Sequence, residues 1–175
     1  MSNSGVCAFS CMYACVQTLY IMKRSLLFLV MLTAAIFVWA DDIPVCYVDL
    51  GLPSGTHWKA VDEPGYYTYP SARYYFGDAL PNKAQVEELL YNCTWKWTGK
   101  GYKVTGPNQN SIYFPFNGYQ DCDEDLHQYG SAAMLWTLDN AGANFAYYYI
   151  LSDRQRTILE DSNCKGCSVR LVISE

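Results

Sequence analysis

The sequence predicts an α+β domain in which one main helix packs on twisted antiparallel sheets and the N- and C-terminal strands are adjacent. Three observations predict it. Residues 83–91 have the apolar spacing of an amphipathic helix, and residues 94–114 hold three short stretches of alternating polarity separated by turn residues. Residues 45–50 and 167–173, near the two ends of the folded part, both have strand-like composition. A helix that feeds short hairpins is typical of the α+β class.

The helix at residues 83–91 has a start signal as well as an apolar face. Asn82 can cap it, and Gln85 occupies the third helical position, as in a capping box. Val86, Leu89 and Leu90 recur at three- and four-residue intervals, which places them on one face. We therefore expect Leu89 to be a structural residue of the core.

After Asn92 the polarity period changes from 3.6 to two. Trp95 and Trp97 alternate with polar residues, so both are predicted to lie on one side of a strand as structural residues. Turn residues at 99–101 lead into a second strand at 102–105, which carries the structural residue Val104, and residues 106–108 form the next turn. A third strand follows at 111–114. We expect these strands to form one small antiparallel sheet.

Flanking strands complete the predicted sheets. Residues 45–50 and 56–61 are expected to pair, with Trp58 as a structural core residue and His57 facing outward. Residues 132–137 have the composition of a short buried strand, and 144–151 of a central strand, because aromatic residues there run on both faces. Residues 154–159 are a candidate hairpin partner. In residues 167–173, Val169, Leu171 and Ile173 alternate with Ser168, Arg170 and Val172, and this closing strand is predicted to lie near the N-terminal one.

Several short motifs resemble a known family. They are Leu80-Pro81-Asn82, Glu87-Glu88-Leu89-Leu90, Asn92-Cys93-Thr94-Trp95-Lys96-Trp97, residues 101–108 (GYKVTGPN), Asn110-Ser111-Ile112, residues 47–56 (YVDLGLPSGT) and residues 166–172 (GCSVRLV). Together they resemble the Fibrobacter succinogenes major paralogous domain family, a set of secreted and surface modules of Bacteroidetes-type bacteria. The resemblance implies a compact domain similar to the C-type lectin-like fold, with no established general activity.

The sequence also departs from that family. Its members usually carry a longer insert and a second helix before the leucine-proline corner, often with tryptophan and arginine just ahead of the proline, whereas Asp78 and Ala79 stand there in this chain. We therefore expect residues 63–78 to lack that helix. Calcium-dependent lectins of this fold use a Glu-Pro-Asn type triplet and a Trp-Asn-Asp triplet. Residues 106–108 and 136–140 do not supply that set, so the resemblance implies no calcium-dependent sugar site.

The N-terminal 40 residues are predicted to direct export. Lys23 and Arg24 precede an apolar stretch at residues 25–38, and small residues around Ala40 suit cleavage by a signal peptidase. Met22 is the preferred start, which makes residues 1–21 an extension. The alternative is a retained membrane anchor, but the apolar stretch is short for a membrane span. The predicted location is the periplasm, the cell surface or the extracellular space.

Residues 41–175 are predicted to form a single domain. This part has 10 basic and 17 acidic side chains, hence a formal charge of −7. An excess of negative charge argues against nucleic acid and anionic membrane surfaces as partners. No stable membrane span is expected once the signal is removed. The oligomeric state does not follow from the sequence.

Five cysteines remain in residues 41–175, and all are disulfide candidates in an oxidising compartment. They are Cys46, Cys93, Cys122, Cys164 and Cys167. One of the five must stay free or pair with another chain, and the connectivity cannot be deduced from spacing. Cys164 and Cys167 also have the C-x-x-C spacing of a redox or metal pair. That alternative lacks a strand-to-helix context and a second pair.

A tyrosine-rich segment at residues 63–78 is the candidate binding surface. Tyrosine offers a large contact area with a polar tip, which suits recognition of sugar rings or of a protein surface. The competing interpretation is that about half of these rings close over the core. The candidate residues are Tyr66, Tyr67, Tyr69, Tyr74 and Tyr75.

An acidic loop follows at residues 121–125. Asp121, Asp123 and Asp125 alternate as calcium ligands do, but Leu126 and Ala132 replace the glycine and glutamate that an EF-hand loop requires. We expect a solvated loop, with no metal and no cofactor.

The sequence also offers few candidate catalytic residues. Beyond residue 40 the only histidines are His57 and His127, and no nucleophile elbow or zinc-protease helix is present. A glycosidase with paired carboxylates stays open, because its two acids need no fixed spacing.

The sequence therefore predicts an exported, non-enzymatic recognition or surface-structural module whose partner is a glycan or a surface protein. The alternative is a secreted thiol-active or hydrolytic enzyme of lectin-like fold. The thiol version rests on Cys164 and Cys167, and it includes a cysteine-dependent oxidase of the formylglycine-forming kind.

Overall fold

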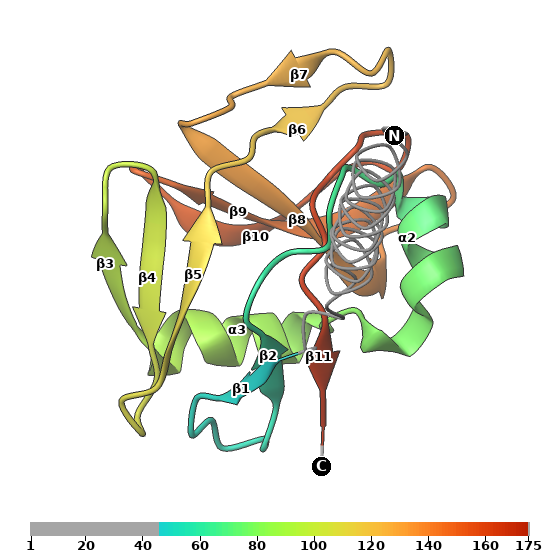
Figure 1. Cartoon of the computed structure of the whole chain (residues 1–175). Coiled ribbons are helices and arrows are strands. Elements are labelled where there is room, and N and C mark those ends of the chain that lie inside the picture. The colour runs from blue at the N-terminus through green and yellow to red at the C-terminus, as the bar shows by residue number, and fades with distance from the viewer. Residues whose placement is uncertain (1–45, 175) are drawn as a thin grey trace, which may run out of the picture. The chain divides into compact units, whose positions relative to one another are not determined.

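The computed structural model describes residues 46–174, which belong to one compact unit built mostly from β-structure with two α-helices (Figure 1). The helical elements are α2 (Tyr69–Phe76), η1 (Gly77–Ala79) and α3 (Lys83–Asn92). The strands are β1 (Tyr47–Asp49), β2 (His57–Lys59), β3 (Thr94–Trp97), β4 (Gly101–Thr105), β5 (Ser111–Pro115), β6 (Tyr119–Gln120), β7 (Leu126–His127), β8 (Ala132–Asn140), β9 (Phe145–Ser152), β10 (Arg156–Ser162) and β11 (Val172–Ile173). The strands form small antiparallel sheets, so the coarse α+β class is confirmed.

Helix α3 begins where the capping box predicts. Asn82 accepts a hydrogen bond from the Gln85 amide (2.9 Å), and the Gln85 side chain accepts one from the Asn82 amide (2.9 Å). Asp139 adds a third acceptor, because its carboxylate accepts a hydrogen bond from the Lys83 amide at 2.7 Å. These bonds satisfy amides that the first turn of a helix leaves unpaired. Leu89 is fully buried, as expected.

The three strands predicted after α3 form the sheet β3-β4-β5. Val104 is fully buried between Trp95 and Ile112 in the register. Trp95 packs against the core, stacked on Phe114, whereas Trp97 is 43% exposed at the end of the hairpin. The two tryptophans therefore share a strand but not the same degree of burial.

The turn at residues 106–108 holds this sheet to the N-terminal corner. The side-chain amides of Asn108 and Asn110 both donate to the carbonyl oxygen of Asp49, at 2.9 and 2.8 Å. A Cβ atom at Gly106 would lie 2.0 Å from the carbonyl oxygen of Leu50, so glycine is required by close approach. This part of the resembling motif therefore has a structural role.

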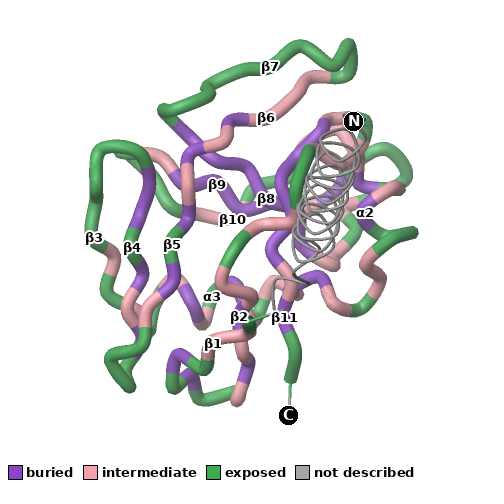
Figure 2. Tube along the Cα trace, in the orientation of Figure 1, coloured by how far each residue is buried: buried purple, intermediate pink, exposed green. Residues whose placement is uncertain are grey.

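In the sheet β10-β9-β8, β8 and β9 have buried residues on both faces, and β9 lies between the other two strands, which confirms it as a central strand. One face packs on α3 and the β3-β4-β5 sheet through Leu135, Tyr149 and Leu151. The opposite face packs on α2 through Trp136 and Tyr148. Buried positions accordingly run continuously along much of β8 and β9 (Figure 2).

The two ends of the described chain meet in the sheet β1-β2-β11, as predicted, with Trp58 fully buried. The C-terminal strand pairs with β2 rather than β1: Val172 lies opposite Trp58, and Trp58 lies opposite Val48. The predicted strand 167–173 shortens to β11, and its alternation is wrong beyond residue 169. Val172 is buried and Ile173 is 46% exposed, the reverse of the expected pattern.

Arg170 explains that reversal. Its side chain is fully buried, pairs with Asp62 (Nε to Oδ1, 2.6 Å), and lies over the Phe114 ring, 4.3 Å from its centroid. It also donates to the main-chain carbonyls of Lys59, Ala60 and Tyr113. Burial raises the pKa of Asp62, and the guanidinium acts in the opposite direction. A buried ion pair with satisfied donors locks an irregular stretch beside β2.

Helix α2 corrects the prediction that residues 63–78 lack a helix. Thr68 caps it by accepting a hydrogen bond from the Ser71 amide, and Pro70 lies in its first turn, where a missing amide costs nothing. Ala72 is fully buried and Tyr69 nearly so, against the sheet. Residues 68–71 contain this helix start signal, but the segment was interpreted by its many tyrosines instead.

The predicted extension at residues 1–21, the signal segment up to residue 40, and Val45 lie outside the described residues. Within residues 46–174, neither α-helix has the length and apolar character required to cross a bilayer.

Candidate functional site

A cleft beside α2 brings together two segments that the sequence analysis singled out, the tyrosine-rich segment and the acidic loop. Its volume is about 310 Å³. We call it the tyrosine cleft. It is lined by Tyr66, Tyr67, Thr68, Ser71, Tyr75, Gln120, Asp121, Glu124, Cys164 and Gly166.

The five candidate tyrosines have three different environments. Tyr69 is buried in the core, edge-on to Trp136, and its hydroxyl donates to the Leu138 carbonyl at 2.7 Å. Tyr66 and Tyr67 are half-buried in the wall of the cleft, and their hydroxyls donate to the carbonyls of Asn117 and Pro64. Burial raises the pKa of both Tyr66 and Tyr69, so both phenols stay protonated and act as donors at neutral pH.

Tyr74 and Tyr75 are the exposed members of the set, at 84% and 67%. They pack edge to face on each other, with ring centroids 5.2 Å apart, and Tyr75 also contacts the edge of Tyr67 at 6.4 Å. Tyr75 lines the cleft while Tyr74 extends the aromatic surface along α2. The competing expectation was that about half of these rings close over the core, and Tyr69 is the one of the five that is buried.

Main-chain pairing and one disulfide hold the floor of the cleft. Tyr67 and Cys167 exchange two hydrogen bonds, at 2.9 and 3.0 Å, and Gln120 and Gly166 exchange two at 2.7 and 3.0 Å. The Cys122–Cys164 disulfide then joins the β6–β7 loop to the segment that follows β10. Three segments far apart in the sequence are thereby fixed at one place.

The acidic loop forms the rim of the cleft and is internally hydrogen-bonded. One Asp121 oxygen accepts the amides of Asp123 and Asp125, both at 3.0 Å, and the other lies 2.9 Å from Nε2 of His127. The hydrogen bond from His127 lowers the pKa of Asp121, and the two amides act in the same direction. Glu124 lines the cleft and is exposed, so its carboxylate is available to a ligand.

Among the five cysteines of residues 46–174, the three outside the disulfide are free thiols, rather than the single one expected. Burial raises the pKa of Cys93 to about 11 and that of Cys167 further, which keeps both protonated near pH 7. Cys164 is bonded to Cys122, so the C-x-x-C pair is not formed. Cys46 is exposed.

The two histidines of the described residues lie on different strands. His57 is half-buried on β2, and His127 is held by Asp121. Within the described residues, no group of three or more His, Cys, Asp or Glu side chains could hold a metal ion.

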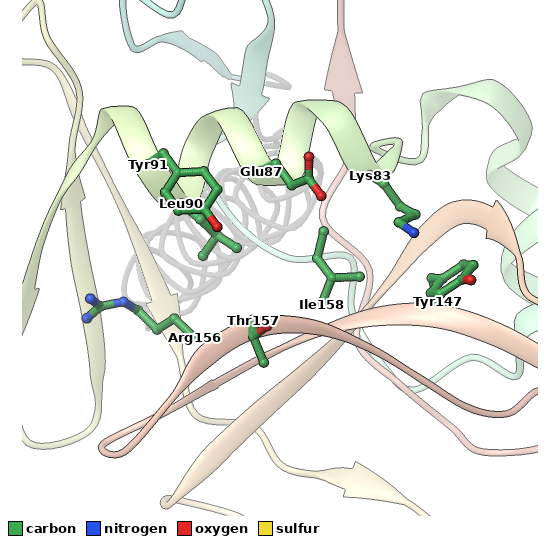
Figure 3. Close-up of a pocket in the computed structure, with 8 residues that line it drawn as sticks. All are labelled: Lys83, Glu87, Leu90, Tyr91, Tyr147, Arg156, Thr157 and Ile158. Carbon is green, nitrogen blue, oxygen red and sulfur yellow. The ribbon is translucent and has the colours of Figure 1, made fainter.

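A second concavity lies between α3 and β10 and was not anticipated (Figure 3). This α3–β10 groove has a volume of about 400 Å³ and is lined by Lys83, Glu87, Leu90, Tyr91, Tyr147, Arg156, Thr157 and Ile158. A sequence signal existed, because Lys83, Glu87 and Tyr91 recur every four residues on one polar helix face. Such a face ordinarily indicates only solvent exposure.

We compared the chain with protein-family models, with curated proteins and with solved structures, and none of them matches it.

Proposed function

We propose that this chain is an exported recognition module that binds a hydroxyl-rich carbohydrate at the tyrosine cleft. The observation that carries the proposal is the convergence of the exposed Tyr75 ring with amide and carboxylate groups on one concave surface, next to which Tyr74 packs on Tyr75. Aromatic faces pack on the apolar faces of sugar rings, and side-chain amides and carboxylates bond to hydroxyl groups.

The polar groups in the cleft are suited to binding rather than to catalysis. The Asp121 carboxylate is engaged by three donors, which leaves Glu124 as the flexible acceptor on the rim. The Gln120 side-chain amide donates to the Glu124 carbonyl at 3.2 Å, so its oxygen remains available as an acceptor. The lowered pKa of Asp121 makes this carboxyl group a poor general acid for glycoside cleavage.

The proposal includes the resemblance drawn from the sequence. A secreted or surface module of the Fibrobacter succinogenes major paralogous domain type, with a fold related to C-type lectins, would suit a recognition role. Export through the N-terminal signal supports the same role, because free glycans are met outside the cytoplasm. Binding would not depend on calcium, since residues 106–108 serve the structural contacts with Asp49 and Leu50.

The experiment is a glycan-array screen of the full chain, followed by titration of the best neutral oligosaccharide. We expect Tyr75→Ala to weaken binding about tenfold, because it removes an exposed ring with little packing loss. The control is Phe145→Ala, which removes a 51% exposed aromatic ring from β9 that lines neither concavity. Equal losses in both variants, or no glycan bound by the wild type, would contradict the proposal.

A surface-structural role is the second candidate, and the exposed thiol of Cys46 favours it. That thiol lies directly before β1, where it can reach a second chain. Non-reducing gel electrophoresis tests this role: a covalent dimer in the wild type that Cys46→Ser abolishes would support assembly.

A further inference from the structure

The α3–β10 groove holds two cationic side chains near its two ends. Lys83 lies at the start of α3 and Arg156 at the start of β10, with Glu87, Leu90 and Ile158 among the residues between them (Figure 3). From Lys83 to Tyr91, the groove follows eight residues of helix, or about 12 Å. A ligand that reaches both cations therefore extends along the groove from one end to the other (Figure 3).

Aromatic rings hold both cations in place. The Lys83 ammonium lies 3.8 Å from the centroid of the Tyr147 ring. The Arg156 guanidinium lies 5.3 Å from the Trp95 ring and 5.1 Å from the Tyr102 ring, two rings that pack edge to face on each other. Contacts of this kind orient the charge without using its N–H donors. The cations are thus preorganised at little entropic cost to a ligand.

No carboxylate within residues 46–174 pairs with either cation. Glu87 stands one helical turn after Lys83, the spacing at which a helical ion pair forms, yet the Lys83 side chain lies over Tyr147 instead. The groove therefore carries two positive groups and one negative group, in a chain whose formal charge is −5. A guanidinium with unengaged donors in a fixed plane matches the two oxygens of a carboxylate.

We infer that the α3–β10 groove binds an acidic oligosaccharide, with a uronate carboxylate on Arg156. The anion chemistry follows from the groove itself, and the saccharide class rests on the proposed function. The apolar floor of Leu90 and Ile158 and the Tyr91 ring contact the ring faces of the sugar, while Glu87 and Thr157 accept hydrogen bonds from its hydroxyl groups. Lys83 receives a second carboxylate about two helical turns away.

Isothermal titration of the full chain with oligogalacturonate tests the inference, since methyl esterification of the same oligomer removes the charge and keeps the sugar. We expect the acid to bind at least tenfold more tightly than the ester, because a charge-assisted bidentate contact is lost. Arg156→Gln should reduce the affinity for the acid to that of the ester. Arg156→Lys should give an intermediate value, because it keeps the charge without the planar fork.

Arg154→Gln is the matched control, because Arg154 is exposed, lies in the same β9–β10 turn and does not line the groove. It should leave the affinity unchanged. Equal binding of acid and ester, absence of binding, or equal losses in the Arg154 and Arg156 variants would overturn the inference. Binding of an oligoglutamate as tight as that of the uronate would also overturn it, in favour of an acidic peptide.

Two further results separate this inference from the proposed function. Tyr75→Ala should leave uronate binding intact, and Arg156→Gln should leave neutral-glycan binding intact. A failure of binding at one concavity can then be distinguished from a failure at the other. Circular dichroism and thermal melting of Arg156→Lys verify that the variant keeps its fold when the side chain over Trp95 is changed.

Discussion

The tyrosine cleft and the α3–β10 groove are both lined by tyrosines, but their charges are opposite. The cleft has a carboxylate rim at Asp121 and Glu124, whereas the groove has Lys83 and Arg156 near its ends. Aromatic walls supply contact area to either kind of ligand, and the charged groups then decide which one is favoured. A high tyrosine content therefore indicates a recognition surface, but it does not indicate which ligand binds there.

The two concavities also differ in how they are held. The cleft joins the start of α2 to a two-residue strand pair and a loop, through main-chain pairs and the Cys122–Cys164 disulfide. The groove lies between a capped helix and a sheet that packs on it through Val86 and Leu89. Local stability should accordingly be lower around the cleft, since few regular hydrogen bonds cross it.

Removal of the disulfide should give the largest difference in local stability between the cleft and the groove. The double variant Cys122→Ser, Cys164→Ser opens a closure across 42 residues, which should lower the free energy of unfolding by about 2–4 kcal/mol. Amide hydrogen exchange should accelerate most at residues 119–127 and 163–168, and least in α3. Urea unfolding and exchange mass spectrometry measure the two effects.

Cys46→Ser is the control for the disulfide variant, because it removes an exposed free thiol and should change neither quantity. Acceleration in α3 equal to that in the β6–β7 loop would mean that the two concavities are not held independently.

Removal of a helix cap should change the local stability of one concavity at a time, with a smaller effect. Asn82→Ala deletes one half of the capping box of α3 and should cost about 1 kcal/mol. The first turn, which carries Lys83, should then fray. Thr68→Ala is the matched change at the N-cap of α2, and it should loosen the wall of the cleft instead. Hydrogen exchange should accelerate in the first turn of α3 in Asn82→Ala and in the first turn of α2 in Thr68→Ala. Acceleration of both turns in either variant would contradict the view that the cleft and the groove are held independently.

Sequence periodicity predicted the parts of the fold whose order is local. The α3 capping box and the three strands after it lie within 35 residues, and each was set by a nearby signal such as Asn82 or the turn at 99–101. The pairing of the chain ends was also predictable, because both have strand-like composition. The exact partner was not, since nothing in residues 45–61 distinguishes the two edges of that small sheet.

Sequence periodicity did not predict contacts between side chains that are distant in the sequence. Arg170 occupies a position that alternation assigned to a polar face, but Asp62, 108 residues earlier, makes its burial favourable. The α3–β10 groove was missed for a similar reason, because Lys83 and Arg156 line one groove only when β10 packs beside α3. The sorting of the five tyrosines into buried, half-buried and exposed rings also required the structure. Tyr69, for example, is buried against Trp136, which is distant in sequence.

Acid titration of the cleft rim gives the smallest expected effect and the most local one. The His127 hydrogen bond holds the folded-state pKa of Asp121 below its ordinary value of 3.8. A carboxylate with a depressed pKa contributes stability above the unfolded value, and that contribution is lost as the pH falls through the folded value. The amide signals of Asp123 and Asp125, which donate to Asp121, should therefore show an acid transition whose midpoint lies below 3.8. Asp121→Asn should abolish this transition while leaving the α3 amides unchanged. A midpoint at or above 3.8 would show that the rim is not preorganised by this carboxylate, and that the cleft keeps its shape through the disulfide and the main-chain pairs alone.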